Sequence, residues 1–538
     1  MDFLQVNYDK YNKIWTGQKM SSLYNMEDNS LGRILFTQMK MHPSKVIQID
    51  DIDGKVSTNQ EMLSLAIRFA LYLKGRRMAS EDIIGIAARN TTYLTPVVLG
   101  CLFNGTPFHA VNPNFQEASI AHCFAITKPP IIFCDGRDYK KIHTTTKSFK
   151  PEIYTISEHV EGVPTVMDLF VPNQMEYFYA PQSPTMGAEQ TVAILCSSGT
   201  TGLPKAVTVA GPKLSLEYPL LNSDDVFYAA SGVDWMSGLS CLLWNCYTGC
   251  TRILTSKPFS ACYFVELVKK YKISSIFLAP MHVVALNECP DFRAENVSTI
   301  RAVQAGGGYV SEENFRKLQK IIPKAVIGFG YGLTEVGGIA GKYGIVHGKA
   351  VGKIIPNVQV QIVDDDGKRL GPNEVGEVVA KVPCRWAGYY GNPIETQRVM
   401  DSLGWIRTGD LGYVDDEGYM FIVDRKKDIL KYRSLHYWPG EIENAIRELP
   451  EVADCCVVGI FDDRVGDVPG ALVIRRKGSK LTEQQIIDHV KTRLVEPEKQ
   501  LHNGVYFVDD LPQNSNGKVV KREVREIFKS LMAQNLDR

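Results

Sequence analysis

Residues 191–205, TVAILCSSGTTGLPK, join a short apolar run to a loop of glycines, hydroxyl side chains and one lysine. Gly199 and Gly202 allow the backbone to turn tightly and bring its amides close to a ligand. Lys205 adds a positive charge. The hydroxyl donors of the loop are Ser197, Ser198, Thr200 and Thr201. Such a loop after a strand is typical of a site that holds a phosphate chain, although an ordinary polar turn would have the same composition.

The loop differs from a Walker A loop. Its glycines are two residues apart, where the Walker A pattern has four residues between them, and Pro204 stands before Lys205. Around the loop, short apolar runs alternate with amphipathic stretches up to about residue 350. Examples of the runs are IIGIA (83–87), PPIIFCD (129–135) and SIFLA (275–279). This alternation predicts α/β architecture with parallel sheets.

The pattern of apolar and turn-forming residues changes at two further points along the chain. Turn signals such as DDDGKRLGPNE separate short runs between about residues 350 and 423, which predicts a small antiparallel, β-barrel-like unit. Further on, EIENAIREL, ADCCVVGI and LTEQQIIDHVKTRL predict a helix, a strand and a helix, the last with a capping box at Thr482 and Gln485. We therefore expect an N-terminal domain (1–423), a charged linker (424–428) and a small α+β C-terminal domain (429–538).

Charge and composition limit the class of protein. The 538 residues include 60 Lys+Arg and 60 Asp+Glu, and this balance argues against a nucleic-acid binder, which usually carries a basic surplus. Apolar residues make up 44%, enough for a sizeable core. No apolar run approaches the ~20 residues that a membrane span needs, and MDFLQVNYDKYNK lacks the apolar stretch of a secretory signal. These features predict a soluble cytoplasmic protein.

The cysteines predict neither disulfides nor a zinc site. Twelve are scattered along the chain without a CxxC pair or zinc-like spacing. The densest group, Cys241, Cys246 and Cys250, lies among apolar residues, so we expect small buried side chains there. Free thiols in this number suit a reducing compartment.

Further short motifs follow in a fixed order. They are AGGG (305–308), YGLTE (331–335), GYYGN (388–392), WIRTGDL (405–411), DRKKDILK (424–431), PGEIE (439–443) and QNSNGK (513–518). Each alone would be an ordinary turn or cap, but together with the loop they resemble the motifs of the adenylate-forming superfamily. That superfamily includes acyl-CoA synthetases, 4-coumarate–CoA ligases, beetle luciferases and adenylation domains of peptide synthetases. The chain is most similar to the insect luciferase-like acyl-CoA synthetase branch.

The resemblance implies an ATP site. Tyr331 would stack on the adenine, Thr334 would touch the α-phosphate, and Asp410 would accept both ribose hydroxyls through its two oxygens. Arg425 would reach the ribose or the phosphates, and Glu335 would bind Mg²⁺, a hard cation that prefers oxygen ligands. The implied ATP-binding set is Ser197, Ser198, Gly199, Thr200, Thr201, Gly202, Lys205, Gly306, Gly307, Tyr331, Gly332, Thr334, Asp410, Arg425 and Lys518, with Thr201 as a second candidate Mg²⁺ ligand.

The same resemblance implies catalytic and acyl-binding residues. Lys518 matches the catalytic lysine of the C-terminal domain. In the family this domain is mobile and rotates about a hinge, here residues 424–428, between two half-reactions. Lys427 stands at the hinge position, and Arg433 lies in the loop presented for thioester formation. With Thr334 and Glu335 they form the implied catalytic set. The implied acyl pocket consists of Trp235, Ser237, Gly238, Gly306, Gly308 and Gly332.

Two stretches depart from the family pattern. Ser434 stands where glycine is usual, and glycine tolerates a positive φ better than serine does. Arg433 replaces the lysine of beetle luciferases. In GVDWMSG (232–238), the acidic Asp234 either disfavours a carboxylate substrate or points to solvent.

The implied function is an ATP-dependent acid–thiol ligase with Mg²⁺ as cofactor. It would convert a carboxylic acid, fatty or arylpropenoate-like, into acyl-AMP with release of pyrophosphate, and then pass the acyl group to coenzyme A. The alternatives are a luciferase-type monooxygenase and a degenerate, non-enzymatic acyl or adenylate binder. Relatives of this branch are often peroxisomal through a C-terminal SKL, whereas this chain ends in LDR; peroxisomal entry would need another route. The sequence sets neither the identity of the acid nor the oligomeric state.

Overall fold

The computed structural model of the chain describes residues 4–21, 30–78, 80–183, 187–197, 204–214, 218–308, 310–344, 348–426, 430–433, 435–513 and 519–536. The chain divides into two compact units. The first comprises Met1–Gln361, Val379–Ile406 and Gly418–Met420, and the second comprises Ile362–Val378, Arg407–Glu417 and Phe421–Arg538. The division into domains at residues 423 and 429 that the sequence suggests stays a prediction.

The first unit contains a six-stranded sheet that carries the phosphate loop. Its strands lie in the order β10, β9, β6, β5, β7 and β8. In that order they span Lys205–Ala210, Thr191–Ser197, Phe108–Ala110, Ile84–Ala87, Ile131–Asp135 and Glu152–Ser157. The strands from β9 to β8 are parallel, and β10 runs antiparallel to β9. The predicted parallel α/β sheet is therefore confirmed.

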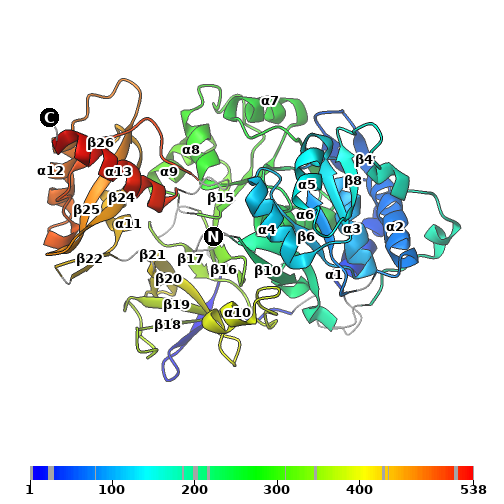
Figure 1. The fold of residues 1–538 in the computed structure, drawn as a ribbon, viewed down its shortest axis with the longest axis horizontal. Coiled ribbons are helices and arrows are strands. Elements are labelled where there is room, and N and C mark those ends of the chain that lie inside the picture. Colours follow the sequence, from blue (N-terminus) through cyan, green and yellow to red (C-terminus); the bar gives the residue numbers. More distant parts are fainter. Residues whose placement is uncertain are drawn as a thin grey trace. The chain divides into compact units, whose positions relative to one another are not determined.

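Helices cover both faces of this sheet (Figure 1). They are α1 (Leu31–Met41), α2 (Asn59–Gly75) and α3 (Leu94–Asn104) on one face, and α4 (Glu117–Thr127) and α5 (Tyr139–Thr145) on the other. Since successive side chains of a strand point to opposite faces, Ile131 and Phe133 pack with α1–α3, while Ile132 and Cys134 pack with α4 and α5. A strand buried on both sides needs apolar residues at every position, which explains runs such as IIFC.

A second sheet of the first unit carries the AGGG and YGLTE motifs. Its neighbouring strands are β17, β16, β15, β14, β13, β11, β12, β3 and β4. In that order they span Gly352–Ile354, Gly337–Tyr343, Val326–Leu333, Ala302–Gly306, Ser275–Leu278, Val226–Ala229, Thr251–Leu254, Val46–Asp50 and Val56–Thr58. The strands from β15 to β3 are parallel, whereas β16 and β4 run antiparallel to their neighbours.

The two faces of the second sheet differ. On one face, α7 (Ala261–Tyr271), α8 (Pro280–Glu288) and α9 (Glu312–Ile321) pack on alternate residues of β13, β14 and β15. On the other face, α6 (Met236–Thr248) packs on Phe277 and its neighbours. The parallel strands β11, β13, β14 and β15 end at the same edge of the sheet, the edge at which α/β proteins usually bind ligands.

Short elements complete the first unit. β1 (Val6–Asp9) and β2 (Ile14–Gly17) form a hairpin, and β2 pairs with the start of β18 (Gln359–Val363). β17 pairs with the start of β21 (Tyr419–Arg425). Helix α10 (Pro393–Val399) begins after Asn392, whose side chain accepts from a backbone amide of the first turn.

The second unit contains the continuation of β18 and β21, with parts of β19 (Gly376–Lys381) and β20 (Ile406–Val414). It also contains an α+β module. The elements of the module are β22 (Leu430–Tyr432), β23 (Leu435–Tyr437), α11 (Pro439–Ile446), β24 (Val452–Asp462), β25 (Gly466–Arg475), α12 (Glu483–Arg493), β26 (Val505–Phe507) and α13 (Lys521–Leu536).

The α+β module confirms several expectations from the sequence. Thr482 and Gln485 form the predicted capping box of α12. ADCCVVGI forms the middle of β24, in which Cys455 faces α11 and α12 while Cys456 faces α13. Each of these adjacent cysteines is thus a small buried side chain on one face of the sheet. Among the helices in the part of the chain that the structure describes, none has the length and apolarity to cross a bilayer.

Candidate active site

A β-hairpin holds together the two ends of the phosphate loop. Ser197, the last residue of β9, pairs with Lys205, the first residue of β10. The loop therefore starts at the carboxyl end of a strand in a parallel sheet. Ser198, Gly199, Thr200, Thr201 and Gly202 lie outside the described residues, so their phosphate contacts stay predictions.

Lys205 is fixed by two partners that the sequence analysis did not assign. Its Nζ lies 2.6 Å from Oε2 of Glu395, in the first turn of α10. The same ammonium lies 4.9 Å from the centre of the Tyr389 ring, a cation–π distance. Both ionic side chains are mostly shielded from water. A bound phosphate would either share the Lys205 ammonium with Glu395 or compete with Glu395 for it.

Tyr389 links this lysine to Glu335, the predicted Mg²⁺ ligand. The Tyr389 hydroxyl donates to Oε1 of Glu335 at 3.0 Å. Burial, followed by the nearby Glu335 carboxylate, raises the pKa of Tyr389 above its usual range, so the phenol stays protonated and remains a donor. One aromatic side chain thus contacts both the cation of the phosphate loop and the carboxylate of YGLTE.

Lys213 supports the backbone of Glu335. Its Nζ donates to the Glu335 carbonyl oxygen at 2.6 Å and lies 5.0 Å from the centre of the Trp386 ring. Burial lowers the pKa of the Lys213 amine to about 7. The Trp386 indole in turn donates to the Thr208 carbonyl at 3.0 Å, which attaches the GYYGN segment to β10.

Sequence reasoning missed Lys213, Trp386 and Glu395, and it matched Tyr389 to a motif without giving it a role. The aromatic residues of the GYYGN region were the available signal for Tyr389. No local pattern marks Lys213, because its partner Glu335 is 122 positions away in the sequence. Only the pairing of β10 with the GYYGN segment brings these residues together.

The residues predicted to bind adenine come together at the end of β14 and β15. Gly306 pairs with Gly330, which places the AGGG turn beside Tyr331. Gly307 has a φ of +91°, and a Cβ built there would meet nothing within 4 Å. Thr334 and Glu335 form the turn that joins β15 to β16. The structure therefore gathers these residues at one edge of the sheet, and their individual roles stay predictions.

The predicted acyl residues lie at the same edge. Trp235 precedes α6, and Ser237 and Gly238 lie in its first turn. Glycine is required at position 238, since a Cβ there would be 1.9 Å from the Gly232 carbonyl oxygen. Gly332 is equally crowded, with its Cβ 2.2 Å from the Gly337 carbonyl oxygen, and Gly308 lies against Pro280.

The Asp234 side chain does not simply point to solvent. Its effect on a carboxylate substrate stays a prediction. Its carboxylate folds back over Gly232 and is partly buried. Burial raises the pKa of Asp234 to about 6, although hydrogen bonds from its own backbone and from Asn112 act in the opposite direction. The carboxyl group is therefore part of the loop that precedes α6.

In the second unit, the predicted ribose-binding pair is already in contact. Nε of Arg425 lies 2.7 Å from Oδ1 of Asp410, whose side chain is only 4% exposed. The Asp410 amide donates to the Thr408 hydroxyl at 3.0 Å. Ribose hydroxyls that bind Asp410 would share one carboxylate oxygen with the guanidinium of Arg425.

The structure describes part of the predicted hinge and leaves out the predicted catalytic lysine. Asp424 and Arg425 end β21, and the Asp424 carboxylate accepts from the Gly440 amide at 3.0 Å. Arg433 has a φ of +48° in the turn between β22 and β23, and its guanidinium lies 5.3 Å from the centre of the Tyr432 ring. A positive φ thus falls on Arg433 itself. Lys427, Ser434 and Lys518 lie outside the described residues.

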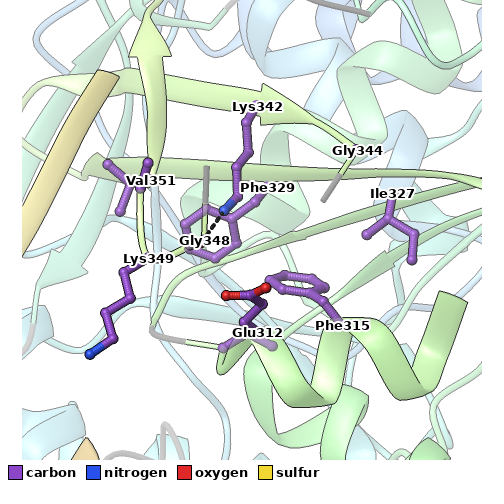
Figure 2. A pocket seen from close by; sticks show the side chains of 11 residues that line it. Glu312, Phe315, Ile327, Phe329, Lys342, Gly344, Gly348, Lys349 and Val351 are labelled. Atoms are coloured by element: carbon purple, nitrogen blue, oxygen red, sulfur yellow. Dashed lines mark hydrogen bonds between the residues drawn. The ribbon is translucent and has the colours of Figure 1, made fainter. Parts of the chain in front are cut away.

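A hollow lies beside β15, on the face of the second sheet that α7, α8 and α9 cover (Figure 2). It encloses about 500 Å³ of empty space, open solvent included. Phe329 and Lys342 face it from paired positions of β15 and β16, and the Lys342 Nζ donates to the Gly348 carbonyl at 3.0 Å. Burial lowers the pKa of Lys342. The remaining lining residues are Val310, Glu312, Phe315, Ile327, Gly344, Lys349, Ala350 and Val351.

The donor set around Glu335 fits a magnesium ion that arrives with a nucleotide. Mg²⁺ in ATP sites usually takes one or two carboxylates and completes its shell with phosphates and waters. One carboxylate oriented by a tyrosine hydroxyl provides such a ligand. Among the described residues, no group of three or more His, Cys, Asp and Glu side chains could form a dedicated metal cage.

Comparison with known proteins places the chain in a family. The AMP-binding enzyme family matches residues 35–390, and the AMP-binding enzyme C-terminal domain matches residues 441–518. Luciferin 4-monooxygenase of Luciola mingrelica is 28% identical over 95% of this chain and 97% of its own length. 4-Coumarate–CoA ligase 3 of Oryza sativa subsp. japonica is 28% identical over 93% of this chain and 92% of its own.

A solved structure shows the same fold. ATP-bound MatB from Rhodopseudomonas palustris superposes with a TM-score of 0.84 at 23% identity, covering 94% of this chain and 100% of that one. The predicted mixed α/β fold, with a large N-terminal and a small C-terminal domain, is thereby confirmed. Both family matches and the motif order agree with this fold, and the chain belongs to the AMP-binding family of adenylate-forming enzymes.

Proposed function

We propose that the protein is an acid–thiol ligase that forms an acyl-AMP and then an acyl-CoA thioester. In the first step, a carboxylate oxygen of the acid attacks the α-phosphorus of ATP, and the bond to the β-phosphate oxygen breaks to release pyrophosphate. In the second, the thiolate of coenzyme A attacks the acyl carbonyl carbon, and AMP leaves with the electrons of the broken bond. The proton of the thiol passes to solvent or to a basic group.

The observation that carries this proposal is the contact of Tyr389 with both Lys205 and Glu335. Attack of an anion on the triphosphate brings like charges together, so the site must supply fixed positive charge and hold the phosphates in line. Lys205 supplies charge at the base of the loop, and Glu335 would hold Mg²⁺, which neutralises phosphate charge when bound. The 4-coumarate–CoA ligase of rice, similar over nearly the full chain, supports the thioester step.

The proposed roles of the remaining residues follow from the same chemistry. Asp410 would orient the ribose, and Lys518 would stabilise the charge that develops at the α-phosphate. Preorganised donors of this kind are usually the largest catalytic contribution, and loss of one typically lowers the rate ~10²–10³-fold.

The test is acid-dependent exchange of radiolabelled pyrophosphate into ATP across a panel of aryl and fatty acids. We expect exchange with at least one acid and near-complete loss of exchange in Lys518→Ala, while ATP still binds by calorimetry. Lys529→Ala, which changes an exposed lysine of α13, is the matched control and should behave as wild type. Normal exchange in Lys518→Ala would remove the assigned role of that lysine.

A second arm of the experiment separates the two half-reactions. With the best acid, addition of coenzyme A should yield one thioester per ATP consumed. The 28% identity to a luciferin 4-monooxygenase makes oxidation of the adenylate by O₂ the second candidate function. Light from luciferin, ATP and O₂, without thioester formation, would favour that candidate over the ligase.

A further inference from the structure

Two thiol groups meet at the surface between α7 and α8, neighbouring helices on one face of the second sheet (Figure 1). Sγ of Cys262, in the first turn of α7, lies 3.6 Å from Sγ of Cys289, the residue that caps the carboxyl end of α8. The two residues are 27 positions apart in the chain, so packing between the helices brings their sulfurs together. Neither residue belongs to the candidate active site.

Exposure distinguishes Cys262 from every other cysteine. Of the twelve cysteines, all of which the structure describes, Cys262 alone is exposed, Cys196 and Cys289 are half-buried, and the rest are buried. Thiol–disulfide exchange requires that an oxidant reach the attacking sulfur. An oxidant in solution can therefore reach Cys262 directly and Cys289 through it.

Both thiols are attached to backbone that is held in place. Cys262 lies within α7, and the Cys289 amide donates to the Leu286 carbonyl at 3.2 Å. The Cys289 carbonyl in turn accepts from the Phe292 amide at 3.1 Å. A disulfide bond is about 2.05 Å long, so the sulfurs would have to approach by roughly 1.5 Å. Rotation of the two short side chains can supply this approach while the backbone stays where it is.

A bond between these sulfurs would hold a helix that borders the candidate active site. α8 begins at Pro280, whose Cγ would lie 3.2 Å from a Cβ built on Gly308 of the AGGG turn. Just before α7, the Phe259 ring stacks on the His282 ring in the first turn of α8, with centres 4.0 Å apart. Cys262 contacts the opposite end of the same helix. The short segment from Phe259 to Cys262 therefore contacts both ends of α8.

A second pair of thiols has the same spacing without the same access. Sγ of Cys196, in β9, lies 3.5 Å from Sγ of Cys123, in α4. The hydrogen bond with Cys123, followed by burial, raises the pKa of Cys196 well above its usual range, and Cys123 itself is only 1% exposed. Buried thiols of this kind are inert. The chain thus contains an internal control in which two sulfurs are close but shielded.

We infer that Cys262 and Cys289 form a reversible dithiol–disulfide couple, a modification site for a small disulfide such as oxidised glutathione, whose product links α7 to α8 within the native fold. The Cys262 thiolate attacks one sulfur of the oxidant, the S–S bond of the oxidant breaks, and one thiolate leaves. The Cys289 thiolate then attacks the Cys262 sulfur and displaces the second thiolate. The protein loses two electrons and two protons, and the oxidant is reduced to two thiols. This inference is independent of the proposed ligase function.

The surroundings of Cys262 make this couple slow. The hydrogen bond with Cys289 and the charge of that residue raise the pKa of Cys262, and the carboxylates of Asp291 and Glu266 raise it further. Because the thiolate is the attacking species, oxidation requires an alkaline buffer or long exposure. In a reducing compartment both thiols stay reduced.

Oxidation of the full chain by glutathione disulfide tests the inference. The dilute protein is incubated at about pH 8.5, near the ordinary pKa of a cysteine thiol, then alkylated, digested and analysed by mass spectrometry. We expect one disulfide, between the peptides of Cys262 and Cys289, with alkylated thiols at Cys123 and Cys196. The intact chain should lose two hydrogen atoms, and dithiothreitol should restore both thiols.

Two variants separate the steps of the reaction. In Cys289→Ser, Cys262 stays exposed, so the reaction should stop at a mixed disulfide with one glutathione per chain. In Cys262→Ser, the accessible thiol is absent, and neither product should form at this pair. Cys196→Ser, at the other half-buried cysteine, is the matched control and should form the same disulfide as wild type.

The melting temperature shows whether the native fold accommodates the bond. The oxidised wild type should melt about 5 °C above the reduced form, because the closed loop constrains the unfolded chain. A lower melting temperature would overturn the inference, since the bond would then strain the contact between α7 and α8.

Three other results would overturn the inference as well. They are unmodified thiols at both positions, a mixed disulfide that persists in wild type, and a bond formed elsewhere, either between Cys123 and Cys196 or between two chains through Cys262. None of these measurements needs ATP or an acid, so failure of the proposed ligase function would leave them unaffected.

Discussion

Replacing Tyr389 with phenylalanine removes a single hydroxyl from the surroundings of the predicted Mg²⁺ ligand. The ring remains, so its cation–π contact with Lys205 is kept, and only the 3.0 Å hydrogen bond to Oε1 of Glu335 is lost. Hydrogen bonds to charged groups contribute about 1.5–3 kcal/mol. Because the Glu335 side chain is only partly buried, water would replace part of this, and we take the lower end of the range. At ~1.4 kcal/mol per decade, the expected loss is about 10-fold.

The assay is pyrophosphate exchange as a function of Mg²⁺ concentration at saturating ATP and acid. The apparent affinity for Mg²⁺ should fall about 10-fold in Tyr389→Phe, since the carboxylate is no longer oriented. Tyr390→Phe is the matched control, because the next tyrosine in the motif is exposed. Tyr389→Leu should lose more, because it also removes the cation–π contact with Lys205, which is worth about 0.5–2 kcal/mol. Melting temperatures exclude a general loss of stability.

The reasoning would be refuted by equal Mg²⁺ dependence in Tyr389→Phe and Tyr390→Phe. It would also be refuted if Tyr389→Phe changed only the melting temperature, since the tyrosine would then support the fold and not the ligand. A change in kcat without a change in the Mg²⁺ dependence would assign the hydroxyl to the substrate rather than to Glu335.

Two further predictions concern the hinge and the loop before α6. Lys427→Pro should impair thioester formation more than adenylation, because a fixed φ restricts domain rotation; equal losses in separate assays of the two half-reactions would contradict this. Asp234 has a pKa raised from 3.8 to about 6, so its neutral form stabilises the fold fully below pH 3.8 and that stabilisation is lost as the pH rises through 6. The shift corresponds to at most about 3 kcal/mol. Asp234→Asn should flatten urea-unfolding free energies between pH 4 and 7, and an unchanged slope would rule this out.

Local patterns predicted the elements but not their partners. The runs IIGIA, PPIIFCD and SIFLA contain β5, β7 and β13, and TVAILC forms all of β9 except its last residue. Strands buried on both faces need uninterrupted apolar residues. The capping box at Thr482 also formed where the spacing placed it, because such a box involves only neighbouring residues. The first three residues of the YGLTE motif, Tyr331 to Leu333, form the end of β15, where it pairs with β16.

In the candidate site, too, motifs identified residues but not their partners. Gly306 and Tyr331 were found from motifs, and the parallel pairing of β14 and β15 brings them together. The Glu395 partner of Lys205 has no signature in the sequence, because a glutamate in the first turn of a helix is ordinary. Its role depends on the position of α10 relative to β10, which is set by contacts between distant segments.

The sequence by itself determined the family, the α/β class and the order of the motifs, because these depend on residue type and spacing along the chain. The tertiary structure decided which groups act on one another. It placed Tyr389 between Lys205 and Glu335 and put Lys213 under the Glu335 backbone. Such contacts depend on strand register and on packing between segments that are often far apart in the chain, and residue order alone does not specify those distances.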